Sequence, residues 1–345
     1  MLAGTDHPHH SNAGVVRCHG SLILTWQRYS NRRYRSCVGA GTDVKLGLLL
    51  ERGIGLGVGL FGKPIGDGPG DRGEGWLDGP RGSNGVIGPE IYDDVAAARG
   101  LTIHRDREGG GLLPSFGALR SDRFDPDLVD DRIRHFYECT TSYSMEMWSK
   151  WHGPLRVFPR MTIRLISPSI QQFNVPLDPL ESSRGMTSEI LEFVAPNGSI
   201  PYVGWLRHSR KEGRVVYAGF YSVCDMPSDD GPHVRVVFPL PKGNATDILR
   251  PENQPDGSFV LDSHGRRFGE RGGYRIHKRN DGGIRAYNSP LRERIHVYLD
   301  DMGDVRTDHT FAMWSTHFLT LHYRMVPKPD PTALQRETAT ATSSD

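Results

Sequence analysis

The chain has 345 residues, 37% of them apolar, with 41 glycines, 24 prolines and a formal net charge of +1. This apolar fraction is sufficient for a hydrophobic core, and the abundance of glycine and proline indicates many turns and loops. The balanced charge argues against a nucleic-acid-binding protein and against attachment to an anionic membrane surface. The four cysteines are widely spaced and form no C-x-x-C pair, so the sequence indicates neither a zinc site nor a disulfide framework.

Residues 1–43 and 327–345 are predicted to be disordered. The first segment lacks hydrophobic periodicity and carries five arginines against two aspartates, and the second is rich in proline, threonine and serine. No secretory signal pattern is recognised, and the most apolar stretch, Val44 to Gly62, is interrupted by charges and glycines. We therefore expect a cytoplasmic protein without a membrane partner.

Residues 44–110 are predicted to be mainly irregular, with a short helix over 89–99. The part from Gly53 to Gly88 contains 14 glycines in 36 residues, and Gly57 to Gly62 matches the dinucleotide-binding pattern G-x-G-x-x-G. That pattern requires a following helix whose N-terminus holds the pyrophosphate, and the proline-containing run after Gly62 cannot form one. We therefore expect no nucleotide cofactor, and we interpret Gly53 to Gly88 as a segment laid over the domain or an ordered lid.

Residues 111–152 are predicted to contain one long amphipathic helix. Asp125 is suited to the N-cap and Pro126 to the first helical position. The apolar residues that follow recur at spacings of three and four, which places them on one side of a helix. They are Val129, Ile133, Phe136, Tyr137, Tyr143, Met147, Trp148 and Trp151. Such a stripe is more often part of a core than a cofactor site, so we expect it to pack on a sheet.

Residues 153–326 are predicted to form an antiparallel β-domain. About ten strand-like runs, from Arg160 to Met325, are separated by short turns, and short turns favour hairpins. The predicted fold is mainly β: a barrel or strongly curved sheet of about ten strands with one long helix packed against it. A closed or nearly closed barrel is favoured because it removes exposed sheet edges.

Several aromatic and polar residues are predicted to converge on the inner face of this sheet. Pairing Phe193 with Pro201, and His208 with Arg214, gives an inner face of Glu189, Leu191, Phe193, Val203, Trp205, Arg207, Val215, Tyr217, Gly219 and Tyr221. Pairing Leu299 with Val305 turns His309 inward and Asp308 outward, so these two neighbours do not form a catalytic dyad. The expected ligand-binding residues are Trp205, Arg207, Tyr217, Tyr221 and His309.

Three functions fit this face. The first is binding of a small, partly apolar ligand, in which Arg207 receives an anionic or carbonyl group; a simple ion pair between Arg207 and Glu189 is the structural alternative. The second is an isomerase, cyclase or hydrolase with His309 or Glu189 as general base and Tyr217 as acid. The third is a non-catalytic interaction module with an interior filled by its own side chains, in which the glycine-rich segment contacts a partner.

No signature of a hydrolase, of phosphoryl transfer or of a metal site is recognised in the chain. His317 and His322 are separated by an odd number of positions, so on one strand they point to opposite faces and cannot share a metal ion. We therefore expect no metal and no cofactor. A small apolar or anionic molecule is the expected partner.

The run from Val236 to Thr246, which contains Phe-Pro-Leu-Pro-Lys-Gly-Asn, resembles a group of uncharacterised bacterial proteins, as do Phe220-Tyr221 before it and Leu321-His322-Tyr323-Arg324 near the end. The resemblance covers about 90 to 326 and brings no activity or functional residue with it. The pattern of one helix and a barrel also resembles the architecture of the calycins, which include lipocalins and fatty-acid-binding proteins. The lipocalin G-x-W signature is absent near the first predicted strand, so this second resemblance concerns architecture alone.

Overall fold

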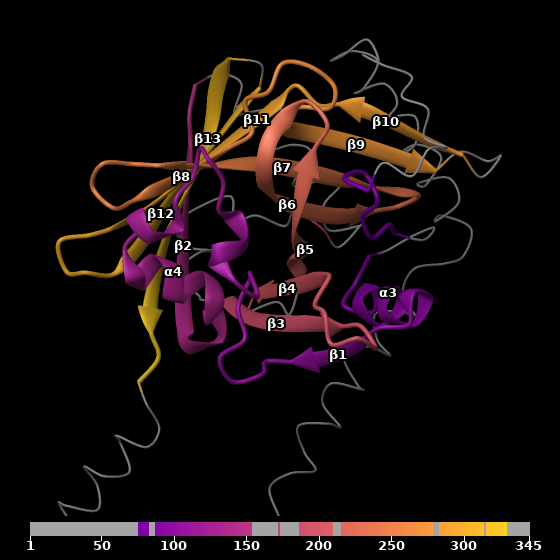
Figure 1. The fold of residues 1–345 in the computed structure, drawn as a ribbon, viewed down its shortest axis with the longest axis horizontal. Helices are drawn as coiled ribbons and strands as arrows, with labels where there is room; N and C mark the ends of the chain where they lie inside the picture. Colours follow the sequence, from indigo (N-terminus) through magenta and orange to yellow (C-terminus); the bar gives the residue numbers. More distant parts are fainter. Residues whose placement is uncertain are drawn as a thin grey trace, which may run out of the picture. The chain divides into compact units, whose positions relative to one another are not determined.

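Thirteen antiparallel strands form one sheet in the described part of the chain (Figure 1). The structure, a computed structural model, describes residues 75–82, 87–153, 172, 186–209, 215–278, 283–313 and 315–329, all within one compact unit, Val58–Asp345. The strands are β1 (Thr102–Arg105), β2 (Tyr143–Trp151), β3 (Met186–Val194), β4 (Tyr202–Ser209), β5 (Val215–Met226), β6 (Asp229–Leu240), β7 (Gly243–Asn253), β8 (Phe259–Asp262), β9 (Gly272–Lys278), β10 (Ile284–Asn288), β11 (Leu291–Leu299), β12 (Val305–Met313) and β13 (Thr316–Pro327).

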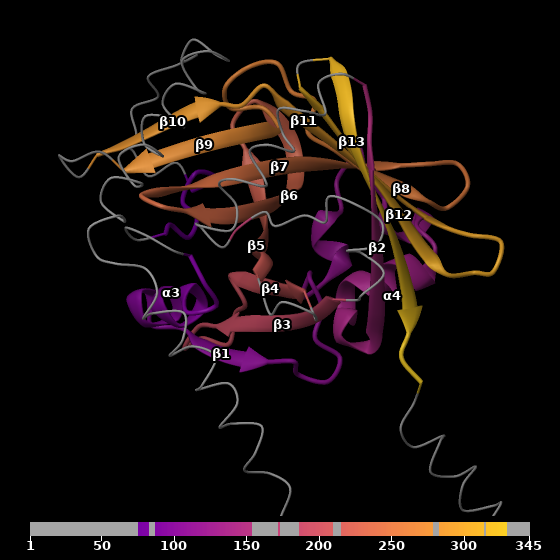
Figure 2. The same ribbon diagram turned by 180° about the vertical axis from the view of Figure 1, so that it is seen from behind.

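The sheet is not closed, which corrects the predicted barrel. Its strand order is β1-β3-β4-β5-β6-β7-β8-β11-β12-β13-β2, and β1 and β2 form the two ends of this path. The long strand β7 explains the difference from a barrel. Its first part, Gly243 to Ile248, pairs with β9, and its second part, Arg250 to Asn253, pairs with β8. The sheet therefore divides at β7 into two halves, with the β9–β10 hairpin attached as a branch (Figures 1 and 2).

The two halves share a core on their inner faces. Trp205 and Val236 come from the half that contains β4 and β6, and Val297 and Met325 from the half that contains β11 and β13, and all four belong to one cluster of buried residues. A second cluster lies on the opposite face of the first half, beneath the helix α3 (Ile91–Arg99). The prediction of a short helix here is confirmed. Gly100 ends it with a φ of 64°, a conformation that glycine adopts at little cost.

The prediction of one long amphipathic helix is wrong, because only the short helix α4 (Asp131–Glu138) forms in this described region. Asp125 caps only a short 3-10 turn, η2 (Pro126–Leu128), and α4 begins after a new N-cap, Asp130. This helix ends where a run of hydroxyl-bearing residues forms the 3-10 turn η3 (Thr140–Ser142). Such side chains compete for backbone hydrogen bonds, and Thr140 Oγ1 donates to the Phe136 carbonyl. Another 3-10 turn, η1 (Phe116–Leu119), packs under α4.

The remainder of the predicted stripe is strand β2, which corrects the helical interpretation. Exposed residues alternate along it, so the strand follows a period of two rather than 3.6. Met147 is buried, whereas the neighbouring Trp148 is 36% exposed. Tyr143, Met147 and Trp151 are four residues apart, a spacing that fits one face of a strand as well as one face of a helix. The polar Ser144, Glu146 and Lys150 between them carry the signal for a strand.

The register of β3 differs by one residue from the predicted one. Phe193 pairs with Tyr202, not with Pro201, and Glu189 therefore pairs with Leu206. A shift of one residue moves every side chain of the strand to the other face. Glu189, Leu191 and Phe193 consequently leave the predicted inner face, and Glu189 accepts a hydrogen bond from Arg105 Nη1 at 2.8 Å on the outside.

Gln172 fills a gap in the ladder between β5 and β6. Phe220 pairs with Val237, so two positions further on the same register would place Ala218 opposite Pro239. Proline has no N–H to donate to the ladder. The fully buried side chain of Gln172 replaces the missing bonds. Its Oε1 accepts from the Ala218 N–H at 2.8 Å, and its Nε2 donates to the carbonyls of Ala218 at 2.9 Å and Pro239 at 3.2 Å.

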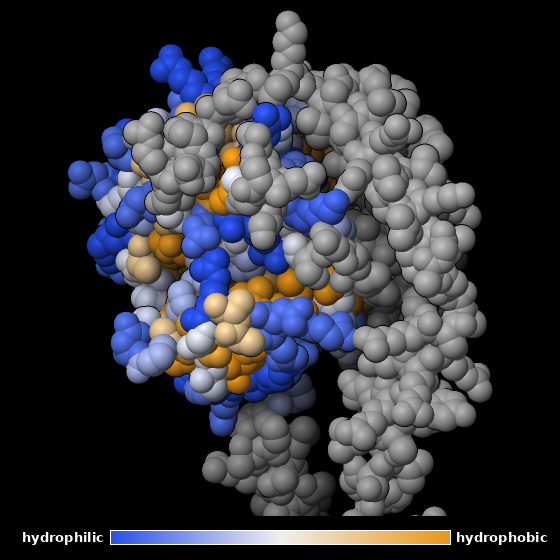
Figure 3. All heavy atoms as spheres, turned by 90° about the vertical axis from the view of Figure 1, so that its right-hand side faces the viewer, coloured by the Kyte–Doolittle hydropathy of each residue, from blue (hydrophilic) through white to orange (hydrophobic). Residues whose placement is uncertain are grey.

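Several predictions concern residues outside the described ranges. They are the disordered leader and most of the tail, the Gly57–Gly62 pattern, most of the glycine-rich segment, and the strand predicted from Arg160 to Ile166. In the described ranges, no helix combines the length and apolar character needed to cross a lipid bilayer. Figure 3 shows one face of the molecule, on which hydrophilic side chains border a band of apolar ones.

Candidate functional site

A cavity of about 290 Å³ lies between the inner faces of the two halves of the sheet. Its walls are mainly apolar and aromatic, with contributions from β2, β4 to β7, β9, β11 to β13 and α4. Ligand sites usually measure 300 to 1,000 Å³, so this cavity suits a small molecule. At about 30 Å³ for a water-sized group, it has room for roughly ten such groups. The cavity also shows that the described side chains do not fill the interior.

Arg207 lies behind one wall of the cavity, in a cage of aromatic rings. The side chain is fully buried, and its guanidinium carbon lies 5.3 Å from the ring centres of Trp205 and Tyr217 and 5.4 Å from that of Tyr323. Its hydrogen bonds to described residues are long: Nη1 donates to Tyr217 Oη at 3.5 Å and Nη2 to Met186 Sδ at 3.6 Å. The buried Nε has no hydrogen-bond partner in the described part of the chain.

This guanidinium has no carboxylate partner among the described residues. Cation–π contacts partly offset the cost of burying the charge, but an uncompensated buried cation remains unfavourable. Tyr217, Tyr221 and Tyr323 line the cavity, and all three lie close enough to Arg207 to act on its charge. Burial raises the pKa of all three, so they remain protonated and can donate hydrogen bonds. This side of the cavity is therefore rich in donors and has a positive charge behind it.

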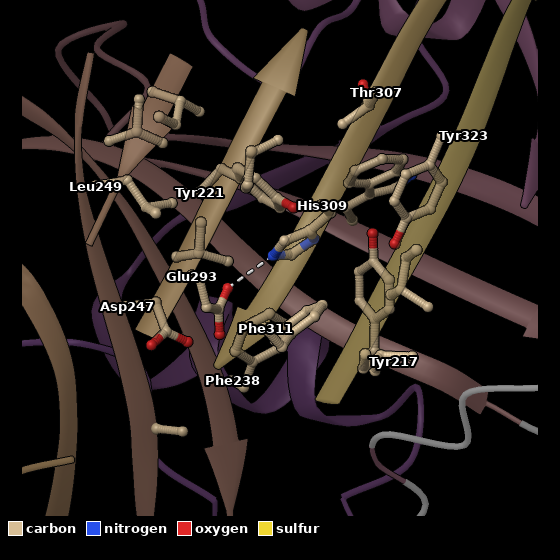
Figure 4. A pocket seen from close by; sticks show the side chains of 18 of the residues that line it. Tyr217, Tyr221, Phe238, Asp247, Leu249, Glu293, Thr307, His309, Phe311 and Tyr323 are labelled. Atoms are coloured by element: carbon tan, nitrogen blue, oxygen red, sulfur yellow. Dashed lines mark hydrogen bonds and ion pairs between the residues drawn. The ribbon is translucent and has the colours of Figure 1, made fainter. Parts of the chain in front are cut away.

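Two carboxyl groups, Asp247 on β7 and Glu293 on β11, meet on the wall of the same cavity. They come from opposite halves of the sheet and lie within hydrogen-bonding distance of each other. His309 Nε2 is 2.9 Å from Glu293 Oε2 (Figure 4). The backbone of Glu293 is fixed by Ser263, whose Oγ accepts from the Glu293 N–H at 2.7 Å. Arg275, on β9, also lines the cavity, and none of the described residues hydrogen-bonds to its Nη1.

Burial determines the charges in this group. Burial raises the pKa of Glu293 to about 7 and raises that of Asp247 well above its usual range, an effect to which the neighbouring Glu293 adds. Burial also lowers the pKa of His309 to about 3. The imidazole is therefore neutral, and its contact with Glu293 is a hydrogen bond rather than an ion pair. Burial and mutual repulsion make it unfavourable for both carboxyl groups to be ionised at once, so the pair shares a proton.

The structure brings most of the predicted site residues together. Trp205, Tyr217, Tyr221 and His309 line the cavity, and Arg207 lies directly behind its wall. The predicted pairing of Leu299 with Val305 is confirmed, and Asp308 points away from His309 toward His322. Two residues are placed differently from the prediction. Glu189 is outside, for the reason given above, and Val215 lies on the outer face because a bulge follows Arg207 in the pairing of β4 with β5.

Three charged residues of the cavity were not predicted as site residues: Asp247, Arg275 and Glu293. The alternation of the predicted strand from Glu293 to Leu299 carried a usable signal, because Glu293 has the same parity as Ile295 and Val297. The meeting of Asp247 with Glu293 had no such signal. The contact between these two residues arises because the sheet divides at β7. The local pattern of hairpins in the sequence does not reveal that division.

Comparison with known proteins gives one distant relative and no family. No family model matches the chain, and no solved structure is similar to it. The chain is similar to a protein of Bacillus subtilis (strain 168) named "Uncharacterized membrane protein YndJ", with 27% identity over 249 residues. The match covers 69% of this chain and 41% of the relative, so the chain spans about two-fifths of the relative's length. These comparisons confirm neither the resemblance carried by the quoted runs nor the resemblance to calycin architecture.

Proposed function

We propose that this protein binds a small, mainly apolar molecule with one anionic or carbonyl group in the cavity. The observation that carries the proposal is the fully buried guanidinium of Arg207, which has no carboxylate partner among the described residues and lies behind tyrosine hydroxyls that face an apolar cavity. A ligand whose acceptor group meets Tyr217 and Tyr221 would supply the missing negative charge. Its apolar part would contact the phenylalanine, leucine and methionine side chains of the other walls.

The size of the cavity suggests a set of test ligands that differ only in their head group. Octanoate, 1-octanol and octylamine share one alkyl chain and contain about ten non-hydrogen atoms, which matches the room available. Trp205 lines the cavity, so the quenching of tryptophan fluorescence reports binding directly. We expect octanoate to bind most tightly and octylamine least. A hydrogen bond to a charged group contributes about 1.5 to 3 kcal/mol, which corresponds to a preference of roughly tenfold or more.

Two variants test the role of the buried cation. Arg207→Met keeps much of the side-chain volume and removes the charge, so it should abolish the preference for octanoate while leaving octanol binding in place. The matched control is Arg294→Met, which removes an exposed arginine from β11 and should change nothing. Saturable binding of none of the three ligands would refute the proposal. An equal preference for octanoate in the wild type and in Arg207→Met would refute the assigned role of Arg207.

A further inference from the structure

The carboxyl pair of the cavity is not explained by ligand binding alone. A ligand with an apolar chain and an acceptor group would be held by the tyrosines and the hydrophobic walls. Asp247 and Glu293 are nevertheless buried, at 7% and 6% exposure, and face the same space. Burying two carboxyl groups costs free energy unless they are paired or have a function. Among the described residues, the other titratable or charged groups that act on Glu293 or respond to it include His309 on β12, Arg275 on β9 and Tyr323 on β13.

The geometry of the pair excludes one common use of two carboxylates. Enzymes that hydrolyse glycosides hold their two carboxyl groups roughly 5 to 9.5 Å apart, so that a sugar and a water fit between them. Asp247 and Glu293 are within hydrogen-bonding distance, and the walls around them are apolar rather than suited to sugar hydroxyls. Among the described residues there is also no group of three or more side chains arranged to hold a metal ion. Proton transfer in a cavity with apolar walls fits these groups better.

A proton acceptor and a set of hydrogen-bond donors face the same space. In the view of Figure 4, His309 lies between the Glu293 carboxyl and the hydroxyls of Tyr217 and Tyr323, and Glu293 is close enough to Tyr323 to act on it electrostatically. The inference requires a ligand that lies alongside His309, with its carbonyl oxygen at the tyrosines and the neighbouring carbon within reach of the Glu293 carboxyl. The donors, with Arg207 behind them, would stabilise negative charge that develops on that oxygen.

We infer that the cavity is the active site of an isomerase for a small, apolar carbonyl compound, with Glu293 as the group that carries the proton. The inference rests on the proposed function, because it requires the same ligand to enter the same cavity. The Glu293 carboxylate takes a proton from the carbon next to the carbonyl, and the electron pair of that C–H bond moves toward the carbonyl oxygen to give an enolate. In a ketone with a C=C bond between its β- and γ-carbons, this intermediate is a dienolate. Protonated Glu293 returns the proton to the γ-carbon, the C=C bond moves into conjugation with the carbonyl, and the C=O bond forms again.

The atoms balance in this reaction without an oxidant, reductant or water. Each neighbour of Glu293 has a defined task. Protonated Asp247 and neutral His309 hydrogen-bond to the Glu293 carboxylate and fix its position. Burial supports the role, since it raises the pKa of Glu293 to about 7, where a carboxylate can both accept and return a proton. His309, with a pKa lowered to about 3, is too weak a base, so Glu293 replaces the general base expected from the sequence.

The test uses oct-4-en-2-one as the probe. It contains about as many non-hydrogen atoms as the cavity holds, and movement of one proton converts it to the conjugated ketone oct-3-en-2-one, whose ultraviolet absorbance is measured. We expect the wild-type protein to accelerate this conversion, with kcat rising as the pH passes through about 7. Glu293→Gln should reduce kcat by roughly a hundredfold or more. Glu146→Gln, which changes an exposed carboxylate on β2, should leave the rate unchanged.

The possible outcomes separate the two proposals. Quenching of tryptophan fluorescence by the probe, measured in parallel, reports binding. If the probe binds but the wild type converts it no faster than Glu293→Gln, the isomerase inference is wrong and the binding proposal stands. If neither this probe nor the three octyl ligands bind, both are wrong. Circular dichroism verifies folding, and Glu293→Asp, which keeps the carboxyl group one methylene further back, provides a second variant that should retain part of the activity and its pH dependence.

Discussion

Replacement of Glu293 by glutamine should change how the stability of the protein depends on pH. In the folded protein, burial raises the pKa of this carboxyl from its ordinary value of 4.5 to about 7. Between these two pH values the folded state keeps a proton that the unfolded state releases. The folded state therefore binds more protons, and the contribution of Glu293 to the free energy of unfolding decreases as the pH rises. That contribution is fully present below about pH 4.5 and is lost above about pH 7.

The size of the effect follows from the shift. About 2.5 pKa units at 1.36 kcal/mol each give roughly 3 kcal/mol. The glutamine in Glu293→Gln cannot ionise, so the variant does not lose this stability. As the pH rises from about 4 to about 8, its free energy of unfolding should therefore increase by about 3 kcal/mol relative to that of the wild type. His309 acts in the opposite direction: its pKa is lowered to about 3, so stability falls as the pH decreases below about 6.5. The lowered pKa of His309 is caused by burial, with an opposing effect of Asp247, so a similar contribution from His309 is expected in both proteins.

Urea denaturation at several pH values, followed by circular dichroism, measures this difference. The same comparison in an Asp247→Asn background controls for the neighbouring carboxyl, whose pKa depends on burial and on Glu293. If the difference in free energy of unfolding between Glu293→Gln and the wild type stays constant across this pH range, the reasoning is refuted. It would mean that Glu293 is already ionised in the folded protein at acid pH and is not a group poised near neutrality.

Three further predictions concern the fold, and each is measured by chemical denaturation. Met147→Ala should cost about 2 to 4 kcal/mol and Trp148→Ala less than about 1 kcal/mol, because the first side chain is buried in strand β2 and the second is exposed; equal costs would contradict the strand. Asp229→Asn should lower the free energy of unfolding by about 3 kcal/mol, because this buried carboxylate contacts Arg250 and Arg271. Asp230 is exposed, so Asp230→Asn should have no measurable effect. If Asp229→Asn leaves the stability unchanged, these contacts do not stabilise the fold. Gly243→Ala should cost at least about 3 kcal/mol because the added Cβ would lie 1.9 Å from the Ile276 carbonyl oxygen, and Gly75→Ala, with open space around it, is the control expected to be neutral.

The fold could be predicted from local patterns where strands are joined by short turns. The hairpin of β11 and β12 has the predicted register, and the positions of Trp205, Arg207 and Tyr217 on one face of β4 and β5 follow from alternation alone. Alternation also places His309 inside. The prediction was wrong where a shift of one residue in the strand pairing changes the face of the sheet. The turn before β4 is one residue longer than predicted, and this places Glu189 on the outer face instead of the inner face.

Features that depend on long-range arrangement could not be predicted from the sequence. The buried residues of β2 fit one face of a helix and one face of a strand equally well. The alternating polar residues between them favour a strand, and pairing with β13 fixes it. The division of the sheet at β7 turns a predicted barrel into two facing halves. It also creates the cavity corner where Asp247 meets Glu293, and no motif in either strand announces that contact.

The bonds between Gln172 and Ala218 have a consequence for local motion. A backbone amide exchanges its hydrogen with solvent only when its hydrogen bond opens. The partner of the Ala218 amide is a side chain 46 positions earlier in the chain, not a neighbouring strand. The exchange rate at this one position therefore records how often Gln172 withdraws, separately from any opening of β5 or β6. Labelled water can thus follow the docking of a single glutamine while the rest of the sheet stays folded.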